Sequence, residues 1–254
     1  MAVQTAIEYG VRRLRLLEFE GTARKLRVLC VHEVKLDVAV DPGGEQDPND
    51  VRAAALSDAM KECGFAQDPC GMCFDGASAT FREFDLPFTG DDQIEKVVHF
   101  ESFQGDLADF VIQHHVLRKT RDKSHILAVG VRKNELLDRL DILDESGLDP
   151  MFVDLDVYAL FNALVGTGLT REHERFVVVD AQDSATSLIF VAAGEIVATR
   201  AMRIGAHGLG AETQSTGASA AEQQAETARR HEFVARLTRE IRRNATRADG
   251  CYRP

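Results

Sequence analysis

The sequence predicts an α/β protein with two similarly built halves and an α+β block inserted into the first half. A strand that ends in an acidic residue, then a loop, then a returning strand occurs near the start, around Glu8, and again around Asp180. Residues 88–150 are instead predicted to form helix, strand, strand and helix. An acidic residue and loop amides at a strand tip could face a phosphate or its metal ion, although an ordinary meander also explains residues 176–205.

Composition limits the class of protein. The 254 residues can form one large domain or two small ones, and 44% hydrophobic with 28% charged residues is typical of a soluble globular chain. A net charge of −11 argues against a nucleic-acid-binding protein with a broad basic face. No apolar run approaches the roughly 18 residues of a membrane span, and the N-terminus lacks signal-peptide features. We therefore expect neither a transmembrane segment nor a nucleic-acid partner.

The elements of the first 87 residues follow from local patterns. Alternating apolar residues predict three strands within residues 5–40. A helix is expected over 51–63, with Gly64 suited to its C-terminal end. Residues 71–86 are expected to form a strand pair that turns at Asp75 and the glycine after it.

The remaining elements are predicted in the same way. In chain order they are a helix over 91–103, strands over 109–117 and 125–131, a helix over 134–147, a strand over 151–153 and a helix over 156–165. Residues 176–205 are expected to form three strands, and a long helix to run from Ser219 or Ala220 to about Thr246. Seven arginines between Arg229 and Arg247 indicate a solvated face, or a contact for an acidic partner.

Two groups of side chains are candidate metal ligands. Cys70 and Cys73 have C-x-x-C spacing, but no second pair completes a zinc site, so structural, reduced thiols are the favoured interpretation over a zinc or thiol-redox site. His114 and His115 are adjacent on a predicted strand and therefore point to opposite faces. We expect no metal site.

Several short motifs, in order, resemble one family. Residues 7–19 (IEYGVRRLRLLEF) fit a family start that is roughly I-D-I-G-S-S-S-V-K-V-V-E-L. Further similar stretches are Arg82–Pro87 (REFDLP), Glu145–Pro150 (ESGLDP), Val153–Asp156 (VDLD), Phe176–Gly205 with Arg200 and Ile204, and Leu237–Arg243 (LTREIRR). The chain thereby resembles PilM-type type IV pilus assembly proteins of the actin-like ATPase superfamily, which are similar to FtsA and to the cytoplasmic part of GspL.

The resemblance implies an actin-like (ribonuclease H-like) α/β fold of two halves. Residues 1–87 and 151–168 would form the first half, 88–150 an inserted α+β subdomain, and 169–254 a partial second half. We expect the second half to be incomplete, because the family's glycine-rich adenosine loop has no counterpart after the Leu237–Arg243 stretch.

The resemblance also implies a vestigial nucleotide site. Its residues would be Glu8, Gly10, Arg15, Asp180, Ser184, Thr186 and Gly205. Departures from the family pattern degrade both phosphate loops: Glu8 replaces Asp, Val11, Arg12 and Arg13 replace serines, Arg15 replaces Lys, and Ala181 and Ala206 replace glycines. Bulky residues obstruct the backbone amides that cradle a phosphate. Arg12 and Arg13 could still neutralise phosphate charge, so we expect ATP and Mg²⁺ to bind weakly or not at all, with no catalytic residues.

The function implied is that of a cytoplasmic scaffold, peripheral on the inner membrane, in a type IV pilus or type II secretion platform. It would bind the cytoplasmic tail of an inner-membrane protein and communicate with an assembly ATPase; the alternative is a nucleotide-binding ATPase or kinase-like enzyme. We expect the tail to add to a strand edge at Phe110–Leu117 or Ile126–Val131. The basic turn at residues 118–123 could instead meet anionic lipid.

Overall fold

The computed structural model describes residues 3–10, 13–22, 25–35, 48–102, 107–171, 174–182, 185–205 and 220–251. The chain forms two compact units, Met1–Thr167 and Gly168–Pro254. None of the helices in these described ranges has an apolar stretch long enough to cross a bilayer.

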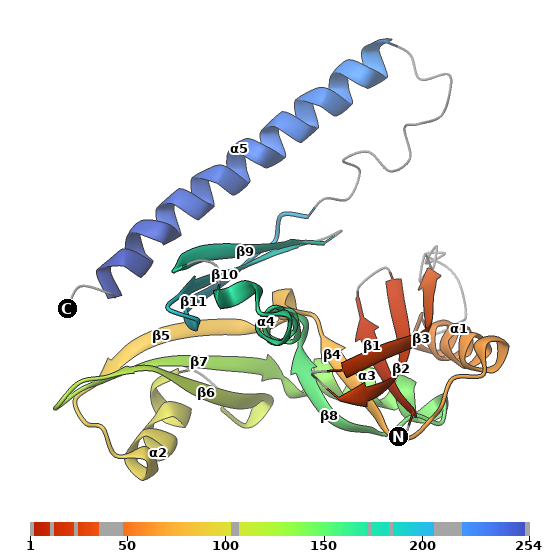
Figure 1. The fold of residues 1–254 in the computed structure, drawn as a ribbon, viewed down its shortest axis with the longest axis horizontal. Coiled ribbons are helices and arrows are strands. Elements are labelled where there is room, and N and C mark those ends of the chain that lie inside the picture. The colour runs from red at the N-terminus through yellow and green to blue at the C-terminus, as the bar shows by residue number, and fades with distance from the viewer. Residues whose placement is uncertain are drawn as a thin grey trace. The chain divides into compact units, whose positions relative to one another are not determined.

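The first unit contains a five-stranded sheet in the order β3-β2-β1-β4-β8 (Figure 1). Its strands are β1 (Val3–Tyr9), β2 (Arg13–Thr22), β3 (Lys25–Lys35), β4 (Cys70–Phe74) and β8 (Pro150–Leu155). β1 pairs antiparallel with β2 and parallel with β4, and β8 pairs parallel with β4. The three strands expected before residue 40 are confirmed, and β3 and β8 are the two edges.

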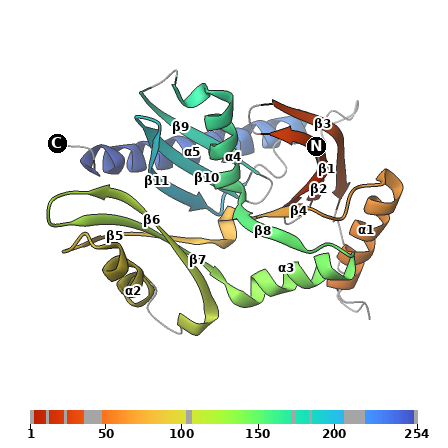
Figure 2. The same ribbon diagram turned by 60° about the horizontal axis from the view of Figure 1, so that its bottom comes forward.

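One face of this sheet is covered by α1 (Pro48–Cys63) and α3 (Lys133–Glu145), which lie against each other (Figure 2). Tyr9 and Phe74 from the sheet are almost fully buried, and the Arg139 guanidinium of α3 stacks over the Tyr9 ring at 4.6 Å. Burial raises the pKa of the Tyr9 phenol, and the positive charges of Arg139 and Arg52 oppose that rise. Tyr9 of β1 therefore lies on the sheet face that the two helices cover.

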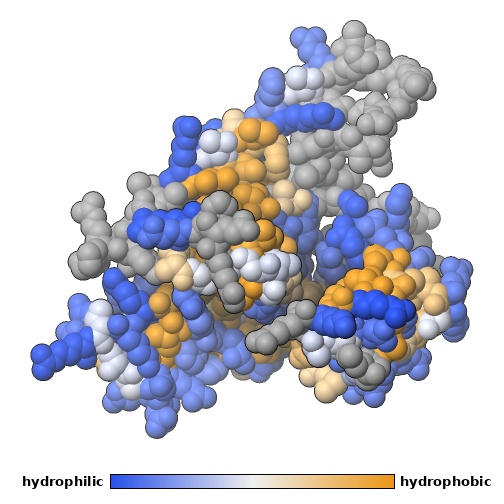
Figure 3. All heavy atoms as spheres, viewed as in Figure 1, coloured by the Kyte–Doolittle hydropathy of each residue, from blue (hydrophilic) through white to orange (hydrophobic). Residues whose placement is uncertain are grey.

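A bulge leaves apolar residues exposed near the β3 edge. The register shifts between Glu18 and Phe19 of β2, so that Cys30 pairs with Glu18 but Val28 pairs with Phe19. Val28 is 50% and Val31 65% exposed. Figure 3 shows apolar side chains gathered over this part of the sheet.

β4 and β5 (Thr80–Leu86) belong to different sheets, so the strand pair predicted for residues 71–86 is wrong. Asp75 does mark a turn, but its carboxylate caps a short 3₁₀ helix, Gly76–Ser78, by accepting from the Ala77 amide at 2.8 Å. Asp156 accepts from the Gly76 amide at 2.8 Å and from its own neighbour Val157 at 2.6 Å, at the start of α4 (Asp156–Thr167). This carboxylate ties the connector between the sheets to α4.

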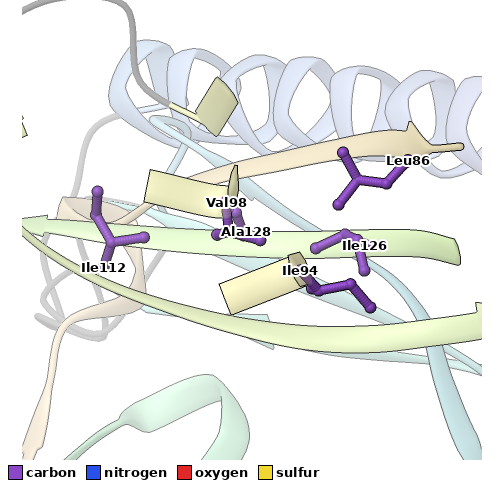
Figure 4. Close-up of a cluster of buried hydrophobic side chains, with 6 residues drawn as sticks. All are labelled: Leu86, Ile94, Val98, Ile112, Ile126 and Ala128. Atoms are coloured by element: carbon purple, nitrogen blue, oxygen red, sulfur yellow. The ribbon is translucent and has the colours of Figure 1, made fainter. Parts of the chain in front are cut away.

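The second sheet has the order β5-β7-β6 and is antiparallel, with β6 spanning Phe110–Lys119 and β7 spanning Ser124–Arg132. The helix α2 (Asp91–Ser102) covers one face. Their shared core consists of Leu86, Ile94, Val98, Ile112, Ile126 and Ala128 (Figure 4). The insert is predicted to start at residue 88, but the first strand of this sheet, β5, lies before that residue.

The second unit is built on an antiparallel meander of β9 (Arg175–Ala181), β10 (Thr186–Ala192) and β11 (Glu195–Met202), as predicted. α5 (Ala220–Cys251) packs on this sheet through Leu237 and Ile241. All seven residues of β10 are buried, which explains the unbroken apolar run over its last five residues, Leu188–Ala192.

We expect Ile126→Ala to lower the free energy of unfolding by about 2–5 kcal/mol, because this side chain is fully buried between α2 and the sheet and its truncation leaves a cavity. Val165→Ala on α4, at a position 42% exposed, is the control and should cost little. Urea denaturation followed by circular dichroism measures both. Equal midpoints for the two variants would contradict the packing described here.

Candidate functional site

The first predicted phosphate loop is the hairpin between β1 and β2. Gly10 follows β1, and its amide donates to the Arg13 carbonyl at 2.9 Å. A Cβ at Gly10 would lie 2.9 Å from that same carbonyl oxygen, which explains the glycine by close backbone approach. Val11 and Arg12 lie outside the described residues.

Glu8 and Arg15 lie directly opposite each other on β1 and β2. Both carboxylate oxygens of Glu8 accept from Nη1 of Arg15, at 2.8 and 3.0 Å. The Nε of Arg15 donates to Glu33 of β3 at 2.9 Å, and Arg13 lies 3.6 Å from the same carboxylate. We call Glu8, Arg15, Glu33 and Arg13 the charge ladder.

The charge ladder shifts the titration of its members. The bond from Arg15 lowers the pKa of Glu33, helped by the charge of Arg13 and opposed by slight burial. The same bond raises the pKa of the Arg15 guanidinium. The acid and the base expected to face a nucleotide are therefore bonded to protein partners, and Glu33, which the sequence did not single out, takes part.

The line of side chains that forms the charge ladder continues across the sheet onto β4 and β8. Glu8 is opposite Cys73, and Cys73 is opposite Asp154, so these side chains share the sheet face that carries the ladder. Burial, together with the charges of Asp154, Asp156 and Glu8, raises the pKa of the Cys73 thiol to about 11. The thiol is therefore protonated, and a poor nucleophile, near neutral pH.

The other candidate metal ligands are separated by strand geometry. Cys70 is opposite Thr5, whereas Cys73 is opposite Glu8, and positions three apart on a strand lie on opposite faces. On β6, His114 is half-buried and His115 is exposed. Across the described part of the chain, no three His, Cys, Asp or Glu side chains converge as a metal site would require.

The second predicted phosphate loop joins β9 and β10. Asp180 accepts from the Gln182 side chain at 3.0 Å, and the Gln182 amide donates to the Ala185 carbonyl at 2.9 Å. Thr186 is fully buried, and its hydroxyl donates to the Ile204 carbonyl at 2.6 Å, next to Gly205. Ser184 lies outside the described residues, as does Ala206 after Gly205.

The arginine of the expected R…I-G ending also has internal partners. Arg200 donates to the Asn244 side-chain oxygen of α5 at 3.2 Å and to the Thr199 carbonyl at 2.7 Å. Asn244 is buried and donates onward to the Glu240 carbonyl at 2.9 Å. Arg200 therefore joins the sheet of the second unit to its helix.

Arg15→Gln should raise the pKa of Glu33 toward its ordinary range, as followed by carboxyl-carbon NMR titration. The folded pKa of Glu33 lies below the unfolded one, so its contribution is present above the unfolded pKa and is lost as pH falls through the folded pKa. The pair is partly exposed, so the stability change should stay below about 1 kcal/mol.

The control for that titration is Arg27→Gln, which breaks an ion pair with Glu20 between the same two strands and should leave Glu33 unchanged. A Glu33 titration that does not respond to Arg15→Gln would contradict the ladder.

Comparison with known proteins agrees with this architecture. A solved PilM–PilN type IV pilus biogenesis complex is similar with a TM-score of 0.75 and 17% identity, over 95% of this chain and 76% of that chain. The cytoplasmic domain of EpsL, an inner-membrane component of the type II secretion system of Vibrio cholerae, is similar with a TM-score of 0.52 and 15% identity, over 86% and 79%. These likenesses confirm the predicted actin-like α/β fold.

Comparison of the sequence with curated proteins gives no significant match. A family model, described as type IV pilus assembly protein PilM, matches residues 7–241, which is nearly the whole chain. The chain therefore belongs to the PilM family of type IV pilus assembly proteins.

Proposed function

We propose that this chain is a scaffold in the assembly platform of a type IV pilus or a related secretion system, and that it binds the cytoplasmic tail of an inner-membrane protein. Family membership supports the assembly role. The similarity to PilM in its complex with PilN, and to EpsL as an inner-membrane component, supports a membrane partner. On this proposal the chain works at the inner face of that membrane, where an assembly ATPase is a further partner.

The observation that carries the docking proposal is the exposed edge strand β8. Three consecutive apolar residues are exposed there: Met151 by 73%, Phe152 by 64% and Val153 by 38%. Within the described residues, β8 has a strand neighbour on one side only, which is β4. Consecutive large apolar side chains at an open edge are typical of an interaction site.

The register of β8 favours side-chain contacts over a long added strand. Cys70 pairs with Pro150 but Met72 pairs with Val153, so Met151 and Phe152 together lie opposite Gly71. Such a bulge interrupts the regular ladder of backbone bonds at an edge. We therefore propose that the tail contributes apolar side chains to this surface, with few backbone bonds.

The two strand segments expected from the sequence to bind the tail are less suited to docking than β8. Ile126–Val131 lies in β7, which is paired on both sides, so that part of the expectation is wrong. β6 is an edge, but on its face away from α2 the exposed Val111 alternates with the polar Gln113 and His115. β8 instead belongs to the five-stranded sheet and directly follows α3 in the sequence.

We expect Phe152→Asp to weaken binding of a labelled tail peptide by at least about tenfold in fluorescence anisotropy, because burial of a phenylalanine contributes about 1.5–3 kcal/mol. Val31→Asp is the matched control, since Val31 is 65% exposed on the opposite edge strand and should bind normally. Val111→Asp tests β6. Loss of binding with Val111→Asp but not with Phe152→Asp would overturn docking at β8.

Gly71→Ala is a subtler variant of the same test. A Cβ at Gly71 would fall 2.4 Å from Cζ of the Phe152 ring, and this exposed ring can rotate away. We expect weaker tail binding with little change in the melting temperature. Unaltered affinity would mean that the ring's position does not matter.

The charge ladder argues against the alternative of an ATPase or kinase-like enzyme. In this proposal Glu8 and Arg15 are vestiges of a phosphate loop whose charges now satisfy each other at 2.8 Å. A nucleotide would have to break that pair, at the small cost of a partly exposed ion pair, and the bulky Val11, Arg12 and Arg13 of the sequence obstruct its approach to the backbone amides.

Isothermal titration with MgATP should therefore detect weak binding or none, and a coupled assay no meaningful hydrolysis. Asp180→Ala, in the second hairpin, should change neither result. Micromolar affinity that Asp180→Ala abolishes would contradict the scaffold proposal in favour of the enzyme.

A further inference from the structure

The tip of the β6–β7 hairpin carries a concentrated positive charge. Residues 118–123 (RKTRDK) are all exposed, and four of the six are Arg or Lys. We call them the basic tip. It lies at the end of the small sheet where β6 ends and β7 begins, and Figure 3 shows hydrophilic side chains there.

The basic tip has a defined shape. The Thr120 amide donates to the Lys123 carbonyl at 2.8 Å, and the Lys123 amide donates back to the Thr120 hydroxyl at 3.1 Å. These bonds close the turn, so Arg118, Arg121 and Lys123 are held by a short, bonded backbone. Lys119 is bonded to Asp91 at the start of α2 and secures the tip to that helix.

The local charge opposes that of the whole chain. Four basic residues, less Asp122 in the turn, Asp91 on Lys119 and Asp85, which lies in the same cross-strand row as His125 and Arg118, leave a charge of 4 − 3 = +1. The whole chain carries −11. At physiological ionic strength charges act over about 8 Å, so a surface touching the tip meets the local charge and is largely screened from the rest.

We propose that the basic tip rests on the anionic headgroups of the membrane to which the tail partner belongs. The tip contains no apolar residue, so this contact is electrostatic adsorption without insertion. The contact is weak alone and rests on the proposed function for its strength, because a bound tail holds the tip near the lipid at high effective concentration. Tail and tip together would fix the orientation of the first unit on the bilayer.

Vesicle flotation of the full chain at about 0.15 M ionic strength, where charges act over about 8 Å, tests this, with phosphatidylcholine vesicles with and without phosphatidylglycerol. The triple variant Arg118→Gln, Arg121→Gln, Lys123→Gln changes the tip from +1 to −2. At about fivefold per charge near the surface, partitioning onto phosphatidylglycerol vesicles should fall on the order of 100-fold. Phosphatidylcholine vesicles should not bind either protein.

The matched control is Lys25→Gln, Lys61→Gln, Lys133→Gln, which removes the same charge at exposed positions elsewhere in the first unit. It should keep vesicle binding. An equal loss in both triples, or equal partitioning of the unaltered chain and the tip triple onto phosphatidylglycerol vesicles, would overturn the proposal.

Tail-peptide affinity in solution separates this proposal from tail docking. The tip triple should bind the peptide as the unaltered chain does. If the chain binds vesicles through the tip but does not bind the peptide, tail docking is refuted and the basic-tip proposal stands.

Discussion

The register of β1 is the constraint on which the first unit depends. β1 lies between an antiparallel neighbour and a parallel one, so each of its residues is fixed against two partners at once. Tyr9 is thereby committed to the helix-covered face, and Glu8 to the face with Arg15 and Cys73. A slip of one residue would place a carboxylate under α1 and α3 and a phenol in the charge ladder, and both exchanges are costly.

In both hairpins the acidic residue near the end of the first strand is hydrogen-bonded to a side chain of the same hairpin. Glu8 reaches a cross-strand arginine, and the Asp180 carboxylate accepts from a side chain two positions on. Thr186 is bonded to backbone. A phosphate-binding loop presents donors to the ligand, whereas the described donors beside these loops, Arg15, Gln182 and Thr186, bond to acceptors within the chain. This physical difference supports the proposal that the chain is a scaffold.

Most elements could be predicted because helical and strand periods are local properties of the sequence. The meander over β9, β10 and β11 is one example, with its buried central strand. Pairing partners could not be predicted in the same way. β4 and β5 are adjacent in sequence, but β4 pairs with β1 and β8 while β5 pairs with β7, and no local signal distinguishes that from a hairpin.

The candidate site shows the same limit. Glu8 and Arg15 were singled out from their family positions, but their bond depends on hairpin register. Glu33 was missed because the bulge between Glu18 and Phe19 changes the pairing of β2 with β3, so counting back from the turn gives the wrong partner. The exposure of Phe152 could not be predicted from the sequence either, since a short apolar strand is equally compatible with a buried position.

The carboxylate of Asp156 has a mechanical consequence. It holds the Gly76 amide in the connector to the small sheet and the Val157 amide in the first turn of α4. A pull on the small sheet, such as one from a partner moving at the membrane, would load this junction directly. Because α4 also packs against β4 and β8, such a load would pass from the small sheet through α4 into the five-stranded sheet.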